Sequence, residues 1–332
     1  MGVMEVDRVL TTGGHHRPRA ARVISGRPWQ DPVLDRACDA VRERYLRVAV
    51  SALRETRTDA ELRSLRVEYL AKAAVGLSRG IEALLVEDPY NPDLHLWLGR
   101  TLIEEAWRIR PTARSRSQQA GGYQAFAKAL QGARDPLKAA AELFPDDPVP
   151  WESMQWLALG LETDASDKEA LWRRAIERWP TLYGAHVARV ISLSPQWGGV
   201  AEEMFDFARV AMSMSAREDP RAALIPLAYF EYFVQERSGL IKGSSSWFSE
   251  AEIRDVEAAA RGWHAGHDPH PRTLEAHNLF GAAFHLGDAR RPARNHLLRT
   301  LGRPAALPWS YLGGSADEQY VKVCRHLNII GG

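Results

Sequence analysis

The sequence is short of the features that mark several common classes of protein. Cysteine occurs only twice in 332 residues, at Cys38 and Cys324, which excludes the disulfide framework of a small secreted domain and is typical of a reducing compartment. No stretch approaches the roughly 18 consecutive apolar residues of a membrane span, and the N-terminus lacks the apolar core of a signal peptide. We therefore expect a cytoplasmic protein without a membrane partner.

An excess of charge of one sign is also missing. The 43 basic and 42 acidic residues leave a net charge of +1, so no overall field attracts nucleic acid or anionic lipid. Charge is uneven only locally, since bases dominate residues 100–138, acids dominate residues 142–169, and residues 290–303 are rich in arginine. Nucleic-acid binding needs a continuous basic stripe, whereas alternating segments favour a protein partner or self-association. We expect no nucleic-acid partner, and a homo-oligomer stays possible.

Signatures of catalysis are missing as well. The sequence contains no glycine-rich nucleotide-binding motif, no EF-hand loop and no Gly-x-Ser-x-Gly nucleophile elbow. The acidic pairs at residues 104–105 and 202–203 are adjacent in sequence. Adjacent residues point to different faces of a helix and cannot form a catalytic dyad by themselves. The sequence therefore predicts no catalytic residue and no cofactor.

What the sequence does have is helical periodicity. From Asp31 onward, apolar residues recur at spacings of three and four, and no alternating β-branched run is bounded by hairpin turns. We predict an all-α protein with a flexible arm over residues 1–30, an N-terminal helical segment over 31–111 and one continuous helical-repeat domain over 112–330. The predicted helices are 32–55, 59–87, 93–109, 123–132, 135–144, 149–162, 167–178, 182–193, 200–216, 221–237, 249–265, 271–287, 289–301 and 317–328.

A repeat is the strongest organisational signal in this helical body. Pro111, Pro145 and Pro180 are 34 and 35 residues apart. The same small and large apolar residues precede each proline: Ala106, Ala140 and Ala175 five positions before, and Ile103, Leu137 and Trp172 eight positions before. A small residue lets two helix backbones approach closely, and the proline ends the helix. The spacing predicts stacked helical hairpins.

This pattern resembles the tetratricopeptide repeat, a helical hairpin of 34 residues. The resemblance covers residues 95–195 best and 274–297 weakly, with Trp151 and Gly121 at matching positions, whereas Lys168 stands where a small residue is usual. It implies a degenerate solenoid whose concave wall is built from the first helix of each hairpin. Carried across residue by residue, the wall would consist of Gln118, Glu152, Trp156, Val187 and Ile191. The implied function is a non-catalytic interaction or scaffold module that binds a peptide or helix of a partner protein.

A Trp-Gly-Gly stretch follows the last of these repeats. We interpret Trp197, Gly198 and Gly199 as a tight corner, with Trp197 covering the end of a hairpin and the glycines permitting the turn. The next helix begins with two glutamates, which disfavour a phosphate site. The stretch is similar to a Trp-Gly-Gly-Ser-x-x-x-Met motif of a bacterial helical-repeat family of unknown function, but Val200 replaces the serine.

A histidine-rich segment near the C-terminus supports the alternative function. His264, His267, Asp268 and His270 could bind a metal ion, with His277 and His285 further along. The Asp-Pro break after His267 and the absence of a second suitably spaced pair argue against a metal site. We therefore predict none. An enzyme, or an accessory subunit of one, with a metal or small ligand in this C-terminal third stays the alternative.

Overall fold

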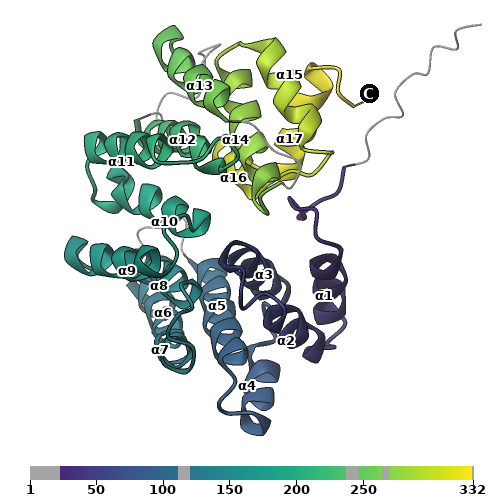
Figure 1. Cartoon of the computed structure of the whole chain (residues 1–332), viewed down its shortest axis with the longest axis vertical. Helices are drawn as coiled ribbons and strands as arrows, with labels where there is room; N and C mark the ends of the chain where they lie inside the picture. The colour runs from purple at the N-terminus through teal and green to yellow at the C-terminus, as the bar shows by residue number, and fades with distance from the viewer. Residues whose placement is uncertain (1–22, 111–119, 237–246, 264–268, 331–332) are drawn as a thin grey trace, which may run out of the picture.

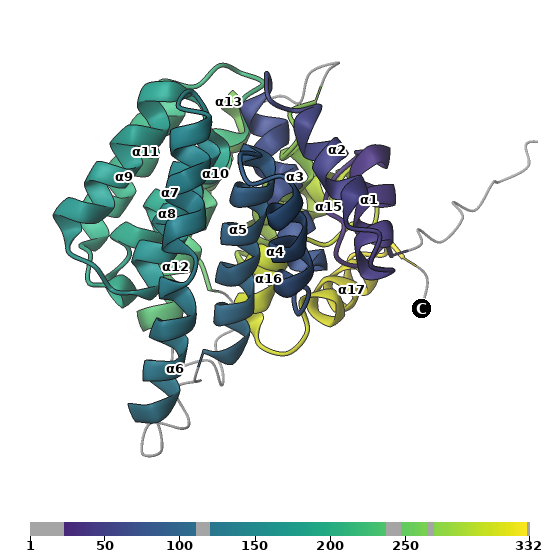
Figure 2. The same ribbon diagram turned by 90° about the horizontal axis from the view of Figure 1, so that it is seen from below.

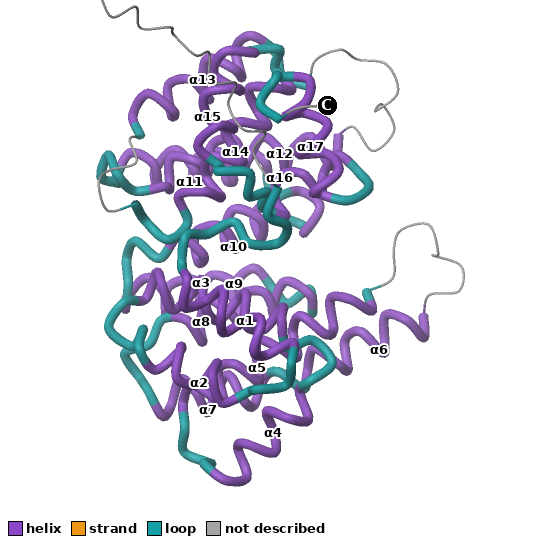
Figure 3. Tube along the Cα trace, turned by 90° about the vertical axis from the view of Figure 1, so that its right-hand side faces the viewer, coloured by secondary structure: helices purple, strands orange, loops and turns teal. Residues whose placement is uncertain are grey.

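The computed structural model describes residues 23–110, 120–236, 247–263 and 269–330, and every regular element in these ranges is helical (Figure 3). The predicted all-α class is confirmed. The helices are α1 Pro32–Arg42, α2 Arg47–Arg54, α3 Ala60–Ala73, α4 Ser78–Glu87, α5 Pro92–Ile109, α6 Ala120–Gln131, α7 Arg134–Leu143, α8 Val149–Gly160, α9 Ala165–Arg178, α10 Tyr183–Leu193, α11 Ala201–Ser213, α12 Leu224–Glu236, α13 Glu250–Gly262, α14 Thr273–Leu286, α15 Arg290–Arg299, α16 Ala306–Trp309 and α17 Ala316–His326, with short 3-10 turns at Pro195–Trp197, Pro220–Ala223 and Ser310–Leu312.

The prediction of two long N-terminal helices was wrong. Residues 32–55 form α1 and α2, and residues 59–87 form α3 and α4. Arg44 and Gly76 interrupt the two stretches with φ values of 69° and 85°. A residue in this left-handed region ends a helix, although the apolar periodicity continues beyond it. The first two helical stretches are therefore two pairs of short helices.

Polar side chains fix the starts of several helices. Asp31 accepts hydrogen bonds from the Val33 and Leu34 amides at the start of α1, and Asn91 accepts from the Asp93 and Leu94 amides at the start of α5. Such N-caps satisfy amides that have no partner within the helix. Ser249 caps α13 in the same way and forms a capping box with Glu252.

A buried ion network ties α3 to α5 and to the loop before α8. The Arg63 guanidinium lies 2.8 Å from Asp93 and 2.7 Å from Asp147. Only 1% of the Arg63 side chain is exposed, so the two carboxylates replace the water that this charge loses on folding. Asp147 also accepts a hydrogen bond from the Val149 amide, which positions the first turn of α8.

The apolar residues form two main cores. One gathers buried residues between 29 and 157, from α1 to α8, and the other gathers residues between 190 and 327, from α10 to α17. The first core therefore includes helices on both sides of residue 111. Helix α10 lies between the two halves of the molecule (Figure 1), and α6 projects from the body (Figure 2).

The repeated residues all lie in the interior. Helices α5, α7 and α9 end just before the three spaced prolines. The six small and large apolar residues that precede those prolines are buried, the most exposed being Trp172 at 9%. Close approach is visible where α5 meets α7, because a Cβ added at Gly99 would lie 2.6 Å from Leu137 Cγ.

The end of the predicted N-terminal arm is anchored. The Ile24 amide donates to the Gly302 carbonyl oxygen at 2.9 Å, and the Arg303 guanidinium donates to the Arg27 carbonyl oxygen at 3.0 Å. Trp29 is 1% exposed and its ring centroid lies 4.3 Å from that of Tyr69. Residues 23–30 therefore pack against both halves of the molecule, and residues 1–22 of the predicted arm lie outside the described ranges.

Candidate functional site

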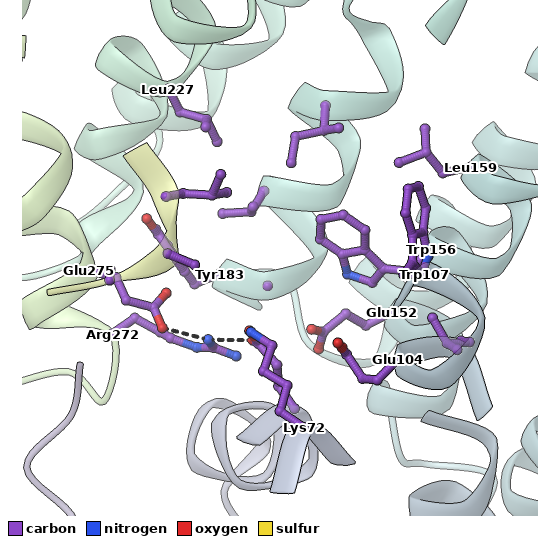
Figure 4. Close-up of a pocket in the computed structure, with 18 of the residues that line it drawn as sticks. Lys72, Glu104, Trp107, Glu152, Trp156, Leu159, Tyr183, Leu227, Arg272 and Glu275 are labelled. Carbon is purple, nitrogen blue, oxygen red and sulfur yellow. Dashed lines mark hydrogen bonds and ion pairs between the residues drawn. The ribbon is translucent and has the colours of Figure 1, made fainter. Parts of the chain in front are cut away.

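A cavity of about 330 Å³ lies between the two cores. Helices α3, α5 and α8 line one side, α12, α14 and α16 line the other, and α10 runs between them. The cavity is amphipathic (Figure 4): Lys72, Glu104, Glu152, Arg272 and Glu275 occupy one half, and indole and leucine side chains occupy the other.

Arg272 organises the charged half of the cavity. Its guanidinium lies 2.7 Å from Glu68 of α3 and 2.8 Å from Glu275 of α14. The Tyr69 hydroxyl donates to Glu275 at 3.1 Å, and Lys72 forms a further ion pair with Glu68. Burial disfavours the charged carboxylate, but Lys72 and Arg272 outweigh it and hold the pKa of Glu68 well below its usual range. Glu68 is thus a fully paired anion that joins α3 to α14.

Glu152 of α8 is the unbalanced group. Glu152 is 3% exposed, and one of its carboxylate oxygens, Oε1, accepts a hydrogen bond from the Ser64 hydroxyl at 3.0 Å. The other oxygen, Oε2, is buried and has no hydrogen-bond partner within the described part of the chain. Burial raises the pKa of Glu152 to about 7, against the opposing charges of Arg272 and Arg100. The cavity wall therefore holds a buried carboxyl group with a free acceptor.

A glycine on the facing helix makes room for this carboxyl group. A Cβ added at Gly184 of α10 would lie 2.7 Å from Glu152 Cδ and 2.8 Å from Ser64 Oγ. These distances are shorter than van der Waals contact, so any larger residue at position 184 would displace the hydrogen-bonded pair. The backbone of α10 thus lies directly against the Glu152–Ser64 pair.

Tryptophans dominate the apolar half. Trp107 and Trp197 pack edge to face with ring centroids 5.7 Å apart, and the Arg110 guanidinium lies 4.5 Å from the Trp197 centroid. Arg100 lies 5.6 Å from the Trp156 ring and forms an ion pair with Glu104 at 3.1 Å. Aliphatic residues complete this wall: Ile103, Leu159, Val187, Ile191, Leu227, Leu279 and Leu307.

A second buried carboxyl group lines the cavity from α12. Glu231 is 1% exposed and accepts hydrogen bonds from Gln196 at 3.0 Å and from the Tyr311 hydroxyl. Burial raises the pKa of Glu231 to about 7. Unlike Glu152, this group has side-chain donors for both of its oxygens.

The cavity collects most of the residues that the repeat register selected. Glu152, Trp156, Val187 and Ile191 all line it, whereas Gln118 lies outside the described residues. The register predicts all five on one concave wall, and the four described residues line one cavity.

The Trp-Gly-Gly corner also contributes to the cavity. Gly198 has a φ of 80°, and a Cβ added at Gly199 would lie 2.7 Å from Leu193 Cα and closer still to the Leu193 carbonyl group. Trp197 is half-buried, and its indole forms part of the cavity wall. The two glycines turn the chain so that this tryptophan faces α5.

The described histidines of the C-terminal third take part in packing and hydrogen bonding. His264, His267 and Asp268 lie outside the described residues. His270 Nε2 lies 3.3 Å from a Glu61 carboxylate oxygen, and His277 Nδ1 lies 3.1 Å from His296 Nδ1. Within the described ranges, no three His, Cys, Asp or Glu side chains are grouped so as to hold a metal ion.

Apart from Glu152, sequence reasoning missed the charged half of the site. Glu68, Lys72, Arg272 and Glu275 come from segments about 200 residues apart and carry no shared motif. One local signal was present: α3, with the sequence Ala-Glu-Leu-Arg-Ser-Leu-Arg-Val-Glu-Tyr-Leu-Ala-Lys-Ala, carries charge on all of its faces. A helix of this kind in the middle of a packed chain must bury charges, and buried charges need partners.

Comparisons with known proteins identify no relative. No protein-family model, no curated protein and no solved structure matches the chain. Among the described helices, none has the length and apolarity needed to cross a lipid bilayer.

Proposed function

We propose that this protein is a non-catalytic binding module, a degenerate tetratricopeptide-like solenoid that holds a segment of a partner protein in the cavity between its two halves. The observation that carries the proposal is the amphipathic cavity itself, in which a buried carboxyl group with a free oxygen faces a wall of tryptophans. Concave sites with an apolar wall and a few oriented polar groups are typical of binding sites.

The size of the cavity limits what the partner contributes. At about 330 Å³, it lies at the lower end of the roughly 300–1,000 Å³ range of ligand pockets. A whole helix does not fit in such a space. The partner therefore inserts one or two side chains of a short segment and rests its remainder on the rim.

Trp156 provides the test of this proposal. A peptide selected for binding to the intact chain should lose about tenfold or more in affinity on Trp156→Ala, since a buried aromatic anchor typically contributes about 2 kcal/mol. The matched control is Trp151→Ala on the same helix: Trp151 is also half-buried, but it lies outside the cavity lining, under Arg174 at 4.6 Å. Equal affinities for both variants and the parent, measured by fluorescence anisotropy with folding checked by circular dichroism, would exclude the cavity as the peptide site.

A free small molecule is the second candidate occupant. It is favoured by the same volume and by the contribution of Arg272 and Glu275, which bring the C-terminal third into the cavity. In this case a small compound would saturate the cavity, and peptides carrying the same chemical group would bind no better than the compound alone.

A further inference from the structure

We infer that the cavity selects a primary ammonium group carried on an apolar chain or ring, such as a lysine side chain or the N-terminal residue of a peptide. This inference rests on the proposed binding function and adds the chemical class of the bound group. It follows from the pairing of the charges in the cavity wall, the geometry at Glu152 and the separation of polar and apolar walls.

Carboxyl groups outnumber cationic groups in the cavity wall. Five glutamates line it, against Lys72, Arg100 and Arg272 as the cationic residues. Each of those three cations already has a carboxylate partner within the wall. An anion that bound one of these three charges would compete with an existing ion pair, whereas Glu152 Oε2 has no hydrogen-bond partner among the described residues that an incoming cation would displace. Because an unpaired buried carboxylate is costly, a cation that pairs with it gains more than it would in water.

The geometry at Glu152 favours an ammonium over a guanidinium. A guanidinium binds best through two parallel hydrogen bonds, one to each carboxylate oxygen. Here Oε1 is engaged by the Ser64 hydroxyl at 3.0 Å and lies against the α10 backbone at Gly184. One free oxygen matches a compact donor, and an ammonium is a compact donor.

The rest of the cavity suits the body that carries this ammonium. The Tyr183 hydroxyl is buried without a hydrogen-bond partner among the described residues and offers a second acceptor in the same wall. The indole rings and aliphatic side chains of the other half receive an apolar chain or ring (Figure 4). Aromatic faces also attract cations, so the tryptophans do not oppose the approach of the ammonium.

Binding of this kind is coupled to the ionisation of Glu152. The charged and titratable groups around its carboxyl come from α3, α5, α10 and the residue before α14: Glu68, Lys72, Arg100, Glu104, Tyr183 and Arg272. With a pKa of about 7 in the free protein, Glu152 is ionised in only a minority of molecules below neutral pH. An alkylammonium such as a lysine side chain stays protonated over this range and binds the ionised form of Glu152, so its affinity should rise by about tenfold between about pH 6 and about pH 8, with release of a proton.

The test is isothermal titration calorimetry on the full chain with three probes. The first probe is phenethylamine, and the second is its neutral analogue 2-phenylethanol. The third is a set of short peptides of two types: one type has a free N-terminal phenylalanine, and the other has a blocked N-terminus together with one internal lysine. We expect the amine to bind about tenfold or more tightly than the alcohol. The Glu152→Gln variant should abolish this preference, and Glu250→Gln, a charge-matched change at a 97% exposed side chain, should leave it intact.

Each outcome decides a different point. Equal binding of amine and alcohol, or a preference for the amine that survives Glu152→Gln, would overturn the ammonium inference. A loss of affinity on Trp156→Ala would still identify the cavity as the binding site. Peptides that bind better than the free amine identify the source as a protein segment, and the reverse order identifies a small metabolite; both support the ammonium. If no probe binds at all, the ammonium inference fails, and the proposed function is decided separately by the selected peptide and the Trp156→Ala variant.

Discussion

Replacing Glu152 by glutamine should make the protein more stable at neutral and alkaline pH. Glutamine keeps the size of the side chain and an oxygen that can accept from Ser64, but it cannot ionise. Burial raises the pKa of Glu152 from the ordinary value of 4.5 to about 7. The native carboxyl group therefore holds its proton more tightly than the unfolded one, and the resulting stability is present below the unfolded-state pKa and lost as the pH rises through about 7.

The magnitude follows from the two pKa values. A difference of one pKa unit corresponds to about 1.4 kcal/mol. Between about pH 5 and about pH 8, the unfolding free energy of the parent should fall by about 2 kcal/mol relative to that of the Glu152→Gln variant. Because Glu152 is almost completely buried, solvent screens little of this effect. Glu231 also has a raised pKa, but it is present in both proteins and cancels in the difference.

Urea unfolding followed by tryptophan fluorescence measures this difference directly. Parent, Glu152→Gln and the exposed-site control Glu250→Gln would be unfolded at several pH values across this range. The control should track the parent at every pH. A Glu152→Gln variant whose stability relative to the parent does not change with pH, or falls as the pH rises, would refute the assignment of a buried carboxyl group with a raised pKa. The expected result is a variant that is more stable and binds less.

Four substitutions test the packing of the cavity wall, the Trp-Gly-Gly corner and the Arg63 network by the same unfolding assay. Gly184→Ala should destabilise the protein by about 1–3 kcal/mol, because the new Cβ overlaps the Glu152–Ser64 pair; an unchanged stability would show that α10 does not lie against this pair. Gly199→Ala should lower the free energy of unfolding by about 2 kcal/mol, because the new Cβ contacts the Leu193 carbonyl group. The control Gly121→Ala, with open space around it, should raise the free energy of unfolding by up to about 1 kcal/mol. Equal effects of the two substitutions would contradict the corner geometry. Arg63→Ala should cost about 3–5 kcal/mol, because it removes the ion-pair partner of the buried Asp147 and one of the two partners of the buried Asp93, which keeps Arg57. A loss below about 1 kcal/mol would show that the network is hydrated.

The sequence predicts the helices well wherever one periodic stretch forms one helix. Residues 149–162 were predicted, and α8 covers Val149–Gly160. Prediction failed where a single residue reverses the chain, as at Arg44, since an arginine with positive φ has no distinctive sequence signal. No helix was predicted over residues 302–315, although this segment contributes Leu307 and Tyr311 to the cavity.

The candidate site likewise contains residues that the sequence predicts and residues that it does not. The predicted repeat register selects Glu152, Trp156, Val187 and Ile191, because a register is a local property that a single sequence can display. The groups around Glu152 show no such local signal: its hydrogen-bond donor Ser64 precedes it by 88 positions, and Arg272, whose charge lowers its pKa, follows it by 120. Hydrophobic periodicity reports which face of a helix is buried, but it does not report which helix is opposite. A three-dimensional structure was needed to join α3 and α14.

That junction changes how the molecule should unfold. In an open array of repeats each unit touches only its neighbours, so the ends fray and units melt one after another. Here Arg272 and Glu275 form hydrogen bonds with α3, which lies about 200 positions earlier in the sequence. Ile24 and Arg27 form hydrogen bonds with residues 302 and 303. Contacts therefore join the N-terminal and C-terminal parts of the chain. Unfolding of either part removes contacts that stabilise the other. We expect these long-range contacts to slow folding and to couple the unfolding of the two halves of the molecule.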